Sequence, residues 1–200
     1  MTGEVWLVAN PRAGGGRSAH HARAALRRLN DTGVPCRLVL PSSGADATAT
    51  AAQAVTAGAR AVVACGGDGT VHAVAQVLVG QQVPLGIVAG GSGDDIAASL
   101  GISTGDPTAT ADWLERALAS NRTRVIDVGR AEADDATSRY FLSVLCTGFD
   151  ASVNERANRM PRLAGQRYNI AIVRELASFT PLKYRVRMDD QERTGEAMLV

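Results

Sequence analysis

Residues 61–78, AVVACGGDGTVHAVAQVL, decide the fold of this 200-residue chain. The stretch opens with an uncharged run, Ala61 to Cys65, which predicts a strand buried on both faces of a parallel sheet. Apolar residues at helical spacing follow, and Thr70 is expected to cap a helix that ends at Leu78. The glycines between these two elements let a ligand approach the backbone closely. A strand, a glycine turn and a helix N-terminus together predict a site for a phosphate anion.

Asp68 lies inside this glycine turn, where its carboxylate would repel a phosphate. A cation between the two groups, or a role in proton transfer, explains an acidic residue in such a place. Asp also stabilises many turns that bind nothing, and for an isolated GGDG turn this structural interpretation stays open. Asp68 is therefore a candidate functional residue, and the other glycine turns of the chain decide between the two interpretations.

Composition limits the classes of protein to which the chain can belong. Hydrophobic residues make up 46% of the sequence, which is enough for an ordinary packed core. The net charge of +1 argues against nucleic acid as the main partner, and no stretch is long enough to span a bilayer. Cys36, Cys65 and Cys146 lack CxxC spacing and are expected to be reduced thiols. Lys183 is the only lysine, which excludes a P-loop with its GK[ST] ending.

Strands and helices alternate through the first part of the chain. We expect strands at 5–9, 36–40, 61–65 and 85–89, and helices at 18–29, 46–57, 70–78, 95–100 and 107–119. Ser18 and Asp106 are expected to cap the first and last of these helices, and His20 and His21 to be solvated. The alternation predicts an α/β domain whose parallel sheet is covered by helices on both faces.

The pattern changes near Asn121. We expect strands at 123–130, 140–146, 183–188 and 197–200, and helices at 153–158 and 166–178. The first two of these strands have no helix between them, which predicts antiparallel pairing. Residues 1–121 are therefore expected to form the α/β domain, and residues 122–200 to begin a second, antiparallel domain that is cut short at Val200.

Glycine-rich turns follow three of the predicted strands, at 10–16, 66–70 and 90–95. In a parallel sheet all three turns open on the carboxyl edge of the strands, which is where ligands bind. We expect the turns to surround one crevice and to bring their aspartates near one another: Asp68, Asp94 and Asp95. Three such turns, two of them carrying carboxylates, favour a ligand site over simple loops.

Five motifs stand in order along the chain: NPRAGGG at 10–16, GGDGTVHAV at 66–74, PLGIVAGGSGDDIAASLGI at 84–102, VIDVG at 125–129 and GFDASV at 148–153. This ordered set resembles the bacterial diacylglycerol kinase and related lipid kinase family over nearly the whole chain. The resemblance implies an ATP-binding first domain, a β-sandwich second domain and a lipid between them. It also implies transfer of the γ-phosphoryl group of ATP to a lipid hydroxyl such as that of diacylglycerol, with Mg²⁺ neutralising phosphate charge.

The resemblance assigns roles to individual residues. The nucleotide would be held by residues of the three turns: Asn10, Pro11, Arg12, Ala13, Gly14, Gly66, Gly67, Asp68, Gly69, Thr70, Val71, His72, Gly91 and Ser92. Asp68 would be the catalytic residue, because it would support the metal or the reacting phosphate. Asp95 would belong with it to the acidic network around Mg²⁺. The general base of the family, a glutamate, would lie beyond Val200.

Three positions depart from the family's usual residues. Family members commonly have glutamate at Ala73, threonine at Ser92 and asparagine at Asp94. A carboxylate at Asp94 is expected to add negative charge near the phosphates. These departures leave open a nucleotide-binding module without turnover. An NAD kinase-like enzyme shares the GGDGT motif, although the first and third turns favour the lipid branch. A redox dinucleotide domain is least favoured, because the first turn is not GxGxxG.

The expected partners are a nucleotide and a lipid substrate at a membrane surface, and a homodimer stays open. A cytoplasmic location is expected, with peripheral contact at the inner membrane face as an extension of it. Four arginines follow the last motif and fit either anionic head groups or a plain solvated face: Arg156, Arg159, Arg162 and Arg167.

Overall fold

The structure, a computed structural model, describes residues 3–102, 106–133, 135, 137–160 and 167–200. Its internal contacts divide the chain into two units, Met1–Ser143 and Val144–Val200. The domain boundary predicted after residue 121 stays a prediction. In the described part of the chain, no helix is both long and apolar enough to cross a membrane.

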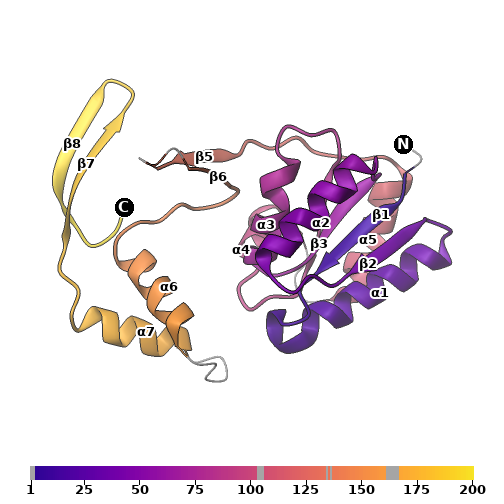
Figure 1. The fold of residues 1–200 in the computed structure, drawn as a ribbon, viewed down its shortest axis with the longest axis horizontal. Helices are drawn as coiled ribbons and strands as arrows, with labels where there is room; N and C mark the ends of the chain where they lie inside the picture. Colours follow the sequence, from indigo (N-terminus) through magenta and orange to yellow (C-terminus); the bar gives the residue numbers. More distant parts are fainter. Residues whose placement is uncertain (1–2, 103–105, 134, 136, 161–166) are drawn as a thin grey trace. The chain divides into compact units, whose positions relative to one another are not determined.

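The first unit contains a four-stranded parallel sheet in the order β2-β1-β3-β4 (Figure 1). Its strands are β1 (Val5–Ala9), β2 (Cys36–Val39), β3 (Ala61–Gly66) and β4 (Leu85–Ala89). Its helices are α1 (Arg17–Asp31), α2 (Gly44–Thr56), α3 (Asp68–Leu78), α4 (Asp95–Ser99) and α5 (Pro107–Ala119), with a short 3₁₀ helix η1 (Ala13–Gly16) before α1. The predicted alternation of strands and helices is confirmed. Asp106 caps α5 as predicted, since its side chain accepts hydrogen bonds from two backbone N–H groups.

Helices cover both faces of this sheet, as predicted. Successive residues of a strand point to opposite faces, so Trp6 and Val8 pack on one side and Val5 and Leu7 on the other. The first pair belongs to a buried cluster with residues of α2, α3 and α4. The second pair belongs to a cluster with residues of α1 and α5. All six residues of β3 are buried, which is the reason for its uninterrupted apolar sequence.

The strand order creates a switch point between β1 and β3. The chain leaves β1, forms β2 on one side of it, and returns to form β3 on the other side. The connections at the carboxyl ends of β1 and β3 therefore diverge, and ligands of open α/β sheets bind in the crevice at such points. The first and second glycine turns are the connections that start there.

Two predicted helix caps are wrong. Helix α1 begins at Arg17 and follows a left-handed glycine, so Ser18 lies within its first turn. The Ser18 hydroxyl instead donates a hydrogen bond to the Cys65 carbonyl oxygen at 2.6 Å. Helix α3 begins at Asp68, which places Thr70 inside the helix, where it cannot act as an N-cap.

The first unit ends in an antiparallel hairpin of β5 (Gly129–Glu132) and β6 (Ser138–Phe141). The Gln76 side chain joins this hairpin to α3, because it donates to the Tyr140 carbonyl at 2.8 Å and accepts from the Tyr140 N–H at 3.0 Å. Antiparallel pairing is confirmed, but the predicted strands 123–130 and 140–146 are too long. Residues 123–128 form no strand, and Val125 in this segment is 96% exposed.

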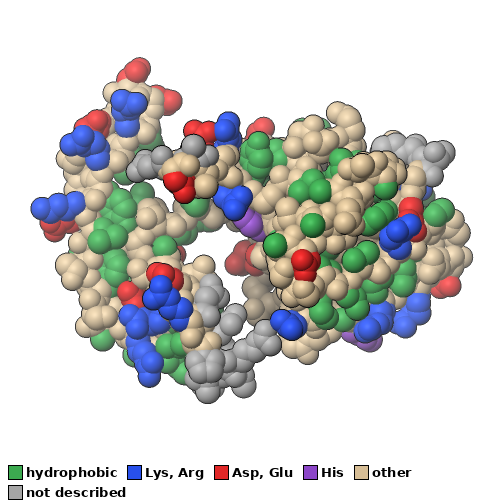
Figure 2. All heavy atoms as spheres, in the orientation of Figure 1, with side chains coloured by type: hydrophobic (Ala, Val, Ile, Leu, Met, Phe, Trp, Pro, Cys, Tyr) green, Lys and Arg blue, Asp and Glu red, His purple; other side chains and the backbone are tan. Residues whose placement is uncertain are grey.

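The second unit contains α6 (Phe149–Arg159), α7 (Arg167–Leu176) and the antiparallel hairpin of β7 (Leu182–Met188) and β8 (Gln191–Ala197). The strand predicted at 197–200 is misplaced, because β8 already starts at Gln191 after a turn at Asp189 and Asp190, and of the predicted residues Leu199 forms an isolated antiparallel bridge with Gly148. The buried core of the second unit is small and consists of Phe149, Val153, Ala157 and Ala171. Apolar side chains are visible on its surface in Figure 2, and Val173 and Leu176 are among the exposed ones.

Cys65 gives a test of the buried sheet. The three cysteines are free, and burial raises the pKa of the Cys65 thiol far above its ordinary value. The reactive form of cysteine is the thiolate, so we expect a thiol reagent at pH 8 to leave Cys65 unmodified in the native chain and to label it after denaturation. Mass spectrometry of peptides measures this. Rapid native labelling of Cys65 would contradict a closed sheet.

Candidate functional site

The second and third glycine turns are in direct backbone contact. A Cβ atom on Gly91 would lie 2.4 Å from the Gly67 Cα, so neither turn could approach the other with a larger residue there. The Gly90 N–H donates to the Gly66 carbonyl at 3.1 Å, which continues the β3–β4 pairing into the turns. These glycines are therefore required by the packing of one turn on the other.

The first turn meets the third turn. Gly14 has a left-handed φ of +57°, and a Cβ atom there would lie 2.1 Å from the Gly90 carbonyl oxygen. The Arg17 Nε donates to the Gly14 carbonyl at 3.1 Å, and its Nη2 donates to the Gly91 carbonyl. All three turns thus meet at the carboxyl edge of the sheet, as the sequence predicted.

Asp68 has two different surroundings, one for each carboxylate oxygen. Its Oδ1 accepts a hydrogen bond from the Ile96 N–H at 2.9 Å, at the start of α4. Its Oδ2 and the Oδ2 of Asp95 each lie 3.3 Å from the point that a Cβ atom on Gly93 would occupy. Asp68 therefore stabilises the third turn and, together with Asp95, places carboxylate oxygens beside Gly93.

Asp94 is directed differently from the other two aspartates. It is only 7% exposed, has a left-handed φ of 64°, and its Oδ1 accepts the Gly91 N–H at 2.9 Å. Aspartate and asparagine tolerate this backbone conformation better than most residues. The structure thus brings Asp68 and Asp95 to Gly93, and it turns the Asp94 carboxylate toward Gly91.

The remaining residues predicted to contact a nucleotide differ in exposure, and Asn10 and Ala13 are half-buried. Asn10 shapes the first turn, because its Oδ1 accepts the Arg12 N–H at 2.9 Å. Several others are exposed: Pro11, Arg12, Gly69, His72 and Ser92. Thr70 and Val71 are buried, the latter in the core cluster under α3. Both polar backbone atoms of Gly91 are already hydrogen-bonded. The contacts of all these residues with a nucleotide stay predictions.

The carboxylates fit a magnesium ion shared with phosphates. Among the residues that the structure describes, no three or more His, Cys, Asp and Glu side chains gather in a way that could hold a metal. Mg²⁺ commonly binds through one or two carboxylates, with phosphate and water oxygens as its other ligands. Asp68 and Asp95 meet that requirement beside Gly93. Their role as metal ligands stays a prediction.

His21 was wrongly expected to be solvated. It is half-buried, and its Nδ1 lies 2.7 Å from the Ala89 carbonyl oxygen at the end of β4, so this nitrogen donates the proton. His20 is exposed, as expected. The sequence did contain a signal for this contact of His21. It follows Arg17 by four residues and therefore lies on the same face of α1.

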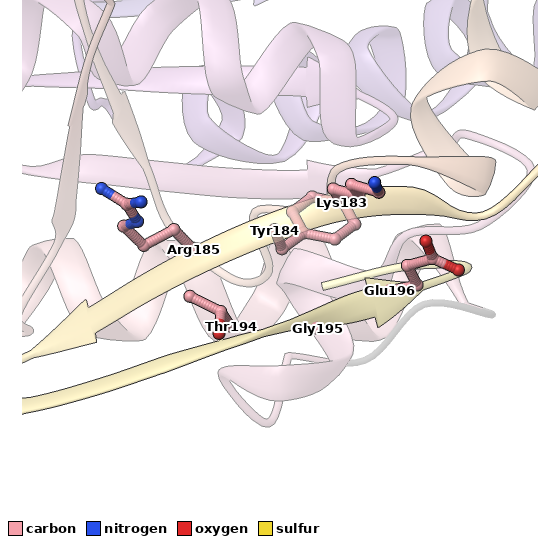
Figure 3. A pocket seen from close by; sticks show the side chains of 6 residues that line it. All are labelled: Lys183, Tyr184, Arg185, Thr194, Gly195 and Glu196. Atoms are coloured by element: carbon pink, nitrogen blue, oxygen red, sulfur yellow. The ribbon is translucent and has the colours of Figure 1, made fainter.

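A shallow hollow of about 630 Å³ lies on the β7–β8 hairpin (Figure 3). Six residues line the hollow: Lys183, Tyr184, Arg185, Thr194, Gly195 and Glu196. None of them was predicted to bind a nucleotide. Lys183 faces Glu196 in the strand register, and Arg185 forms an ion pair with Glu192. Charges of opposite sign on neighbouring strands account for this surface without a ligand.

The fold and the three turns define a class of protein: an α/β protein whose carboxyl edge is built from packed glycine turns and carries a pair of carboxylates. Residues 4–131 match the family described as "Diacylglycerol kinase catalytic domain". Residues 143–200 match the "YegS C-terminal NAD kinase beta sandwich-like domain". The chain belongs to the diacylglycerol kinase catalytic domain family.

Curated relatives agree with this assignment, and a solved structure shares the fold. A "Diacylglycerol kinase" of Mycobacterium tuberculosis is 39% identical over 191 residues, which cover 95% of this chain and 60% of the relative. A "Probable lipid kinase YegS-like" of Chromohalobacter salexigens is 31% identical over 206 residues, covering 99% of this chain and 61% of the relative. The chain thus spans about 60% of the length of these curated relatives. A crystal structure of a diacylglycerol kinase from Bacillus anthracis shares the fold, with a TM-score of 0.68 at 20% identity, over 99% of this chain and 62% of that one.

Proposed function

We propose that this chain binds ATP with Mg²⁺ at the joined glycine turns and takes part in transfer of the γ-phosphoryl group to a lipid hydroxyl such as that of diacylglycerol. The observation that carries the proposal is the meeting of three glycine turns at the carboxyl edge of the sheet, with the carboxylate oxygens of Asp68 and Asp95 beside Gly93. Membership of a kinase family supports it, as do the lipid kinases among the relatives.

The chain's own residues would bind and orient the phosphates. The glycines permit backbone N–H groups to approach phosphate oxygens, which is how a site without a P-loop lysine compensates their charge. Asp68 and Asp95 would hold Mg²⁺ through the oxygens beside Gly93. Bound there, the ion would neutralise negative charge that develops on the phosphates. Positioning and charge compensation supply most of the rate in phosphoryl transfer.

The hydrogen bond from the Ile96 N–H fixes the orientation of Asp68. With Oδ1 occupied by this bond, Oδ2 is the oxygen that remains for a metal or a phosphate-bound water. The Asp94 carboxylate is turned toward Gly91, so it would add less charge at the phosphates than the sequence suggested. Asp94 would then serve as a hydrogen-bond acceptor within the turn.

A panel of acceptors tests the proposal. We expect radiolabel from [γ-³²P]ATP to appear in a lipid product when the protein is incubated with Mg²⁺ and mixed micelles containing diacylglycerol. Sphingosine and NAD are the comparison acceptors, and a reaction with EDTA is the control for the metal. Thin-layer chromatography separates the products.

Each result of the panel identifies a different function. Label in NAD alone would replace the proposal with an NAD kinase-like activity. ATP binding without any labelled product would identify a nucleotide-binding module. Absence of ATP binding, measured by calorimetry on a folded sample, would overturn the proposal altogether. A cytoplasmic location, peripheral membrane contact and a homodimer stay predictions beside it.

A further inference from the structure

The start of α1 donates hydrogen bonds to carbonyl oxygens of the first and third glycine turns and of the ends of β3 and β4. Arg17 reaches the first turn at the Gly14 oxygen, at 3.1 Å, and the third turn at the Gly91 oxygen. Ser18, which is fully buried, reaches the end of β3 at 2.6 Å. His21 reaches the end of β4 at 2.7 Å. These donors lie within residues 17–21, and all the bonds except the one to Gly14 reach acceptors 47 to 74 residues away in sequence.

Arg17 is the member of this group that joins two glycine turns. Its guanidinium is planar and carries N–H donors in a fixed fork, so binding two carbonyls fixes their separation. Gly14 already touches the third turn, because a Cβ atom there would lie 2.1 Å from the Gly90 oxygen and 3.0 Å from the Arg17 Nε. The arginine therefore holds a contact that the glycine makes sterically possible.

The same hydrogen bonds orient N–H groups. In a planar trans peptide the C=O and the following N–H point in opposite directions. Because the Gly14 and Gly91 oxygens are directed at Arg17, the N–H groups of Gly15 and Ser92 point away from it. Carbonyl oxygens repel a phosphate, whereas N–H groups attract one. Arg17 thus holds two peptide groups with their donors facing away from α1, the Gly14 group through its backbone N–H as well as its side chain.

Charge supports the same role. The chain has only one lysine, Lys183, and it lies in β7 of the second unit. Arg17 places a permanent positive charge between the first turn, which also carries Arg12, and the third turn, which carries the carboxylates of Asp94 and Asp95. The two acceptors of its guanidinium, the Gly14 and Gly91 oxygens, are neutral carbonyls.

We infer that Arg17 is a positioning residue for the triphosphate of the nucleotide: it bridges the first and third turns and fixes the peptide N–H groups that bind phosphate. The inference rests on the proposed function, since it concerns the same site. Arg17 is not among the residues predicted to contact the nucleotide. Its effect on phosphate binding would come from the two hydrogen bonds that join the Gly14 and Gly91 carbonyls. Charge alone would not require an arginine.

Displacement of a fluorescent ATP analogue by ATP and by adenosine tests this role in Arg17→Ala, Arg17→Lys and the control Arg23→Ala, which changes an exposed arginine of the same helix. We expect Arg17→Ala to weaken ATP binding by about 10-fold or more, the loss typical of charge-assisted hydrogen bonds, and to leave adenosine binding unchanged. Arg17→Lys should be as weak as Arg17→Ala, because one ammonium cannot reproduce the planar fork. Arg23→Ala should bind like the unchanged protein.

The outcomes separate this inference from the proposed function. If the unchanged protein binds no ATP, the proposed function fails. If it binds ATP and both Arg17 variants bind equally well, the inference fails. Full retention by Arg17→Lys would replace the bridge with a simple charge effect and would also overturn it. Equal losses for ATP and adenosine would indicate general damage to the domain and reject a phosphate-specific role. If Arg17→Ala does not fold, Arg17→Lys decides the question by the same measurements.

Discussion

Replacing Asp68 with asparagine is expected to lower ATP-dependent phosphoryl transfer by about 100-fold or more, which is the loss typical when one preorganised electrostatic group is removed from an active site. The amide oxygen of asparagine can still accept the Ile96 N–H, so the third turn should keep its structure. What disappears is the negative charge beside Asp95 that would hold Mg²⁺. The measurements are the rate of lipid phosphorylation and the dependence of ATP affinity on Mg²⁺ concentration.

Asp68→Ala separates the structural role of this residue from the chemical one. Alanine removes the acceptor for the Ile96 N–H as well as the charge, so we expect an added loss of stability of about 1 kcal/mol, the usual cost of a lost helix-end acceptor. Thermal unfolding measures that difference. Asp31→Asn, which neutralises an exposed carboxylate at the end of α1, is the matched control. Unchanged phosphorylation by Asp68→Asn would remove Asp68 from the chemistry and leave it a residue of the turn.

Gly14→Ala is expected to destabilise the first unit by about 3 kcal/mol and to weaken ATP binding by at least about 10-fold, because a left-handed backbone and a steric clash act together. The added Cβ would lie 2.1 Å from the Gly90 carbonyl oxygen, a backbone atom that cannot rotate away. The first turn must then separate from the third, which removes the arrangement proposed to bind phosphates. Chemical denaturation and nucleotide titration measure the two effects.

Gly33→Ala is the control for this substitution. Gly33, outside the three glycine turns, has a similar φ of +74°, but a Cβ atom there meets nothing within 4 Å. We expect only the cost of a left-handed alanine, about 1 kcal/mol, and nearly normal ATP affinity. Equal effects of the two substitutions would mean that backbone strain dominates and that contact between the turns contributes nothing.

The sheet and its helices could be predicted because their signals are local. An uncharged run such as Ala61 to Cys65 indicates a strand covered on both faces, and apolar residues every three or four positions indicate the helices. The predicted bounds of strands were less accurate where a strand forms only if a partner strand lies beside it. Residues 123–128 have the composition of a strand, yet the described residues offer them no partner, and they form none.

The predictions that Ser18 and Thr70 cap helices were wrong for a related reason. Serine and threonine near a helix start are good caps on average, but a hydroxyl donates or accepts wherever a partner lies closest. Ser18 finds the Cys65 carbonyl of a strand far away in sequence, and Thr70 lies against Gly66, where a Cβ atom would be 2.4 Å from its hydroxyl oxygen. Neither partner is visible in the local sequence.

The sequence by itself determined the alternating strands and helices, the glycines at three strand ends, and the prediction that the turns meet at one edge. These features follow from side-chain periodicity, glycine conformation and the direction of parallel strands. Only the tertiary structure decided that the Asp68 Oδ1 accepts the Ile96 N–H while its Oδ2 lies beside Gly93 with Asp95. The same holds for the two hydrogen bonds by which Arg17 bridges two turns. The physical reason is that a hydrogen bond depends on positions within about 3 Å, and folding alone brings residues 17 and 91 to that distance.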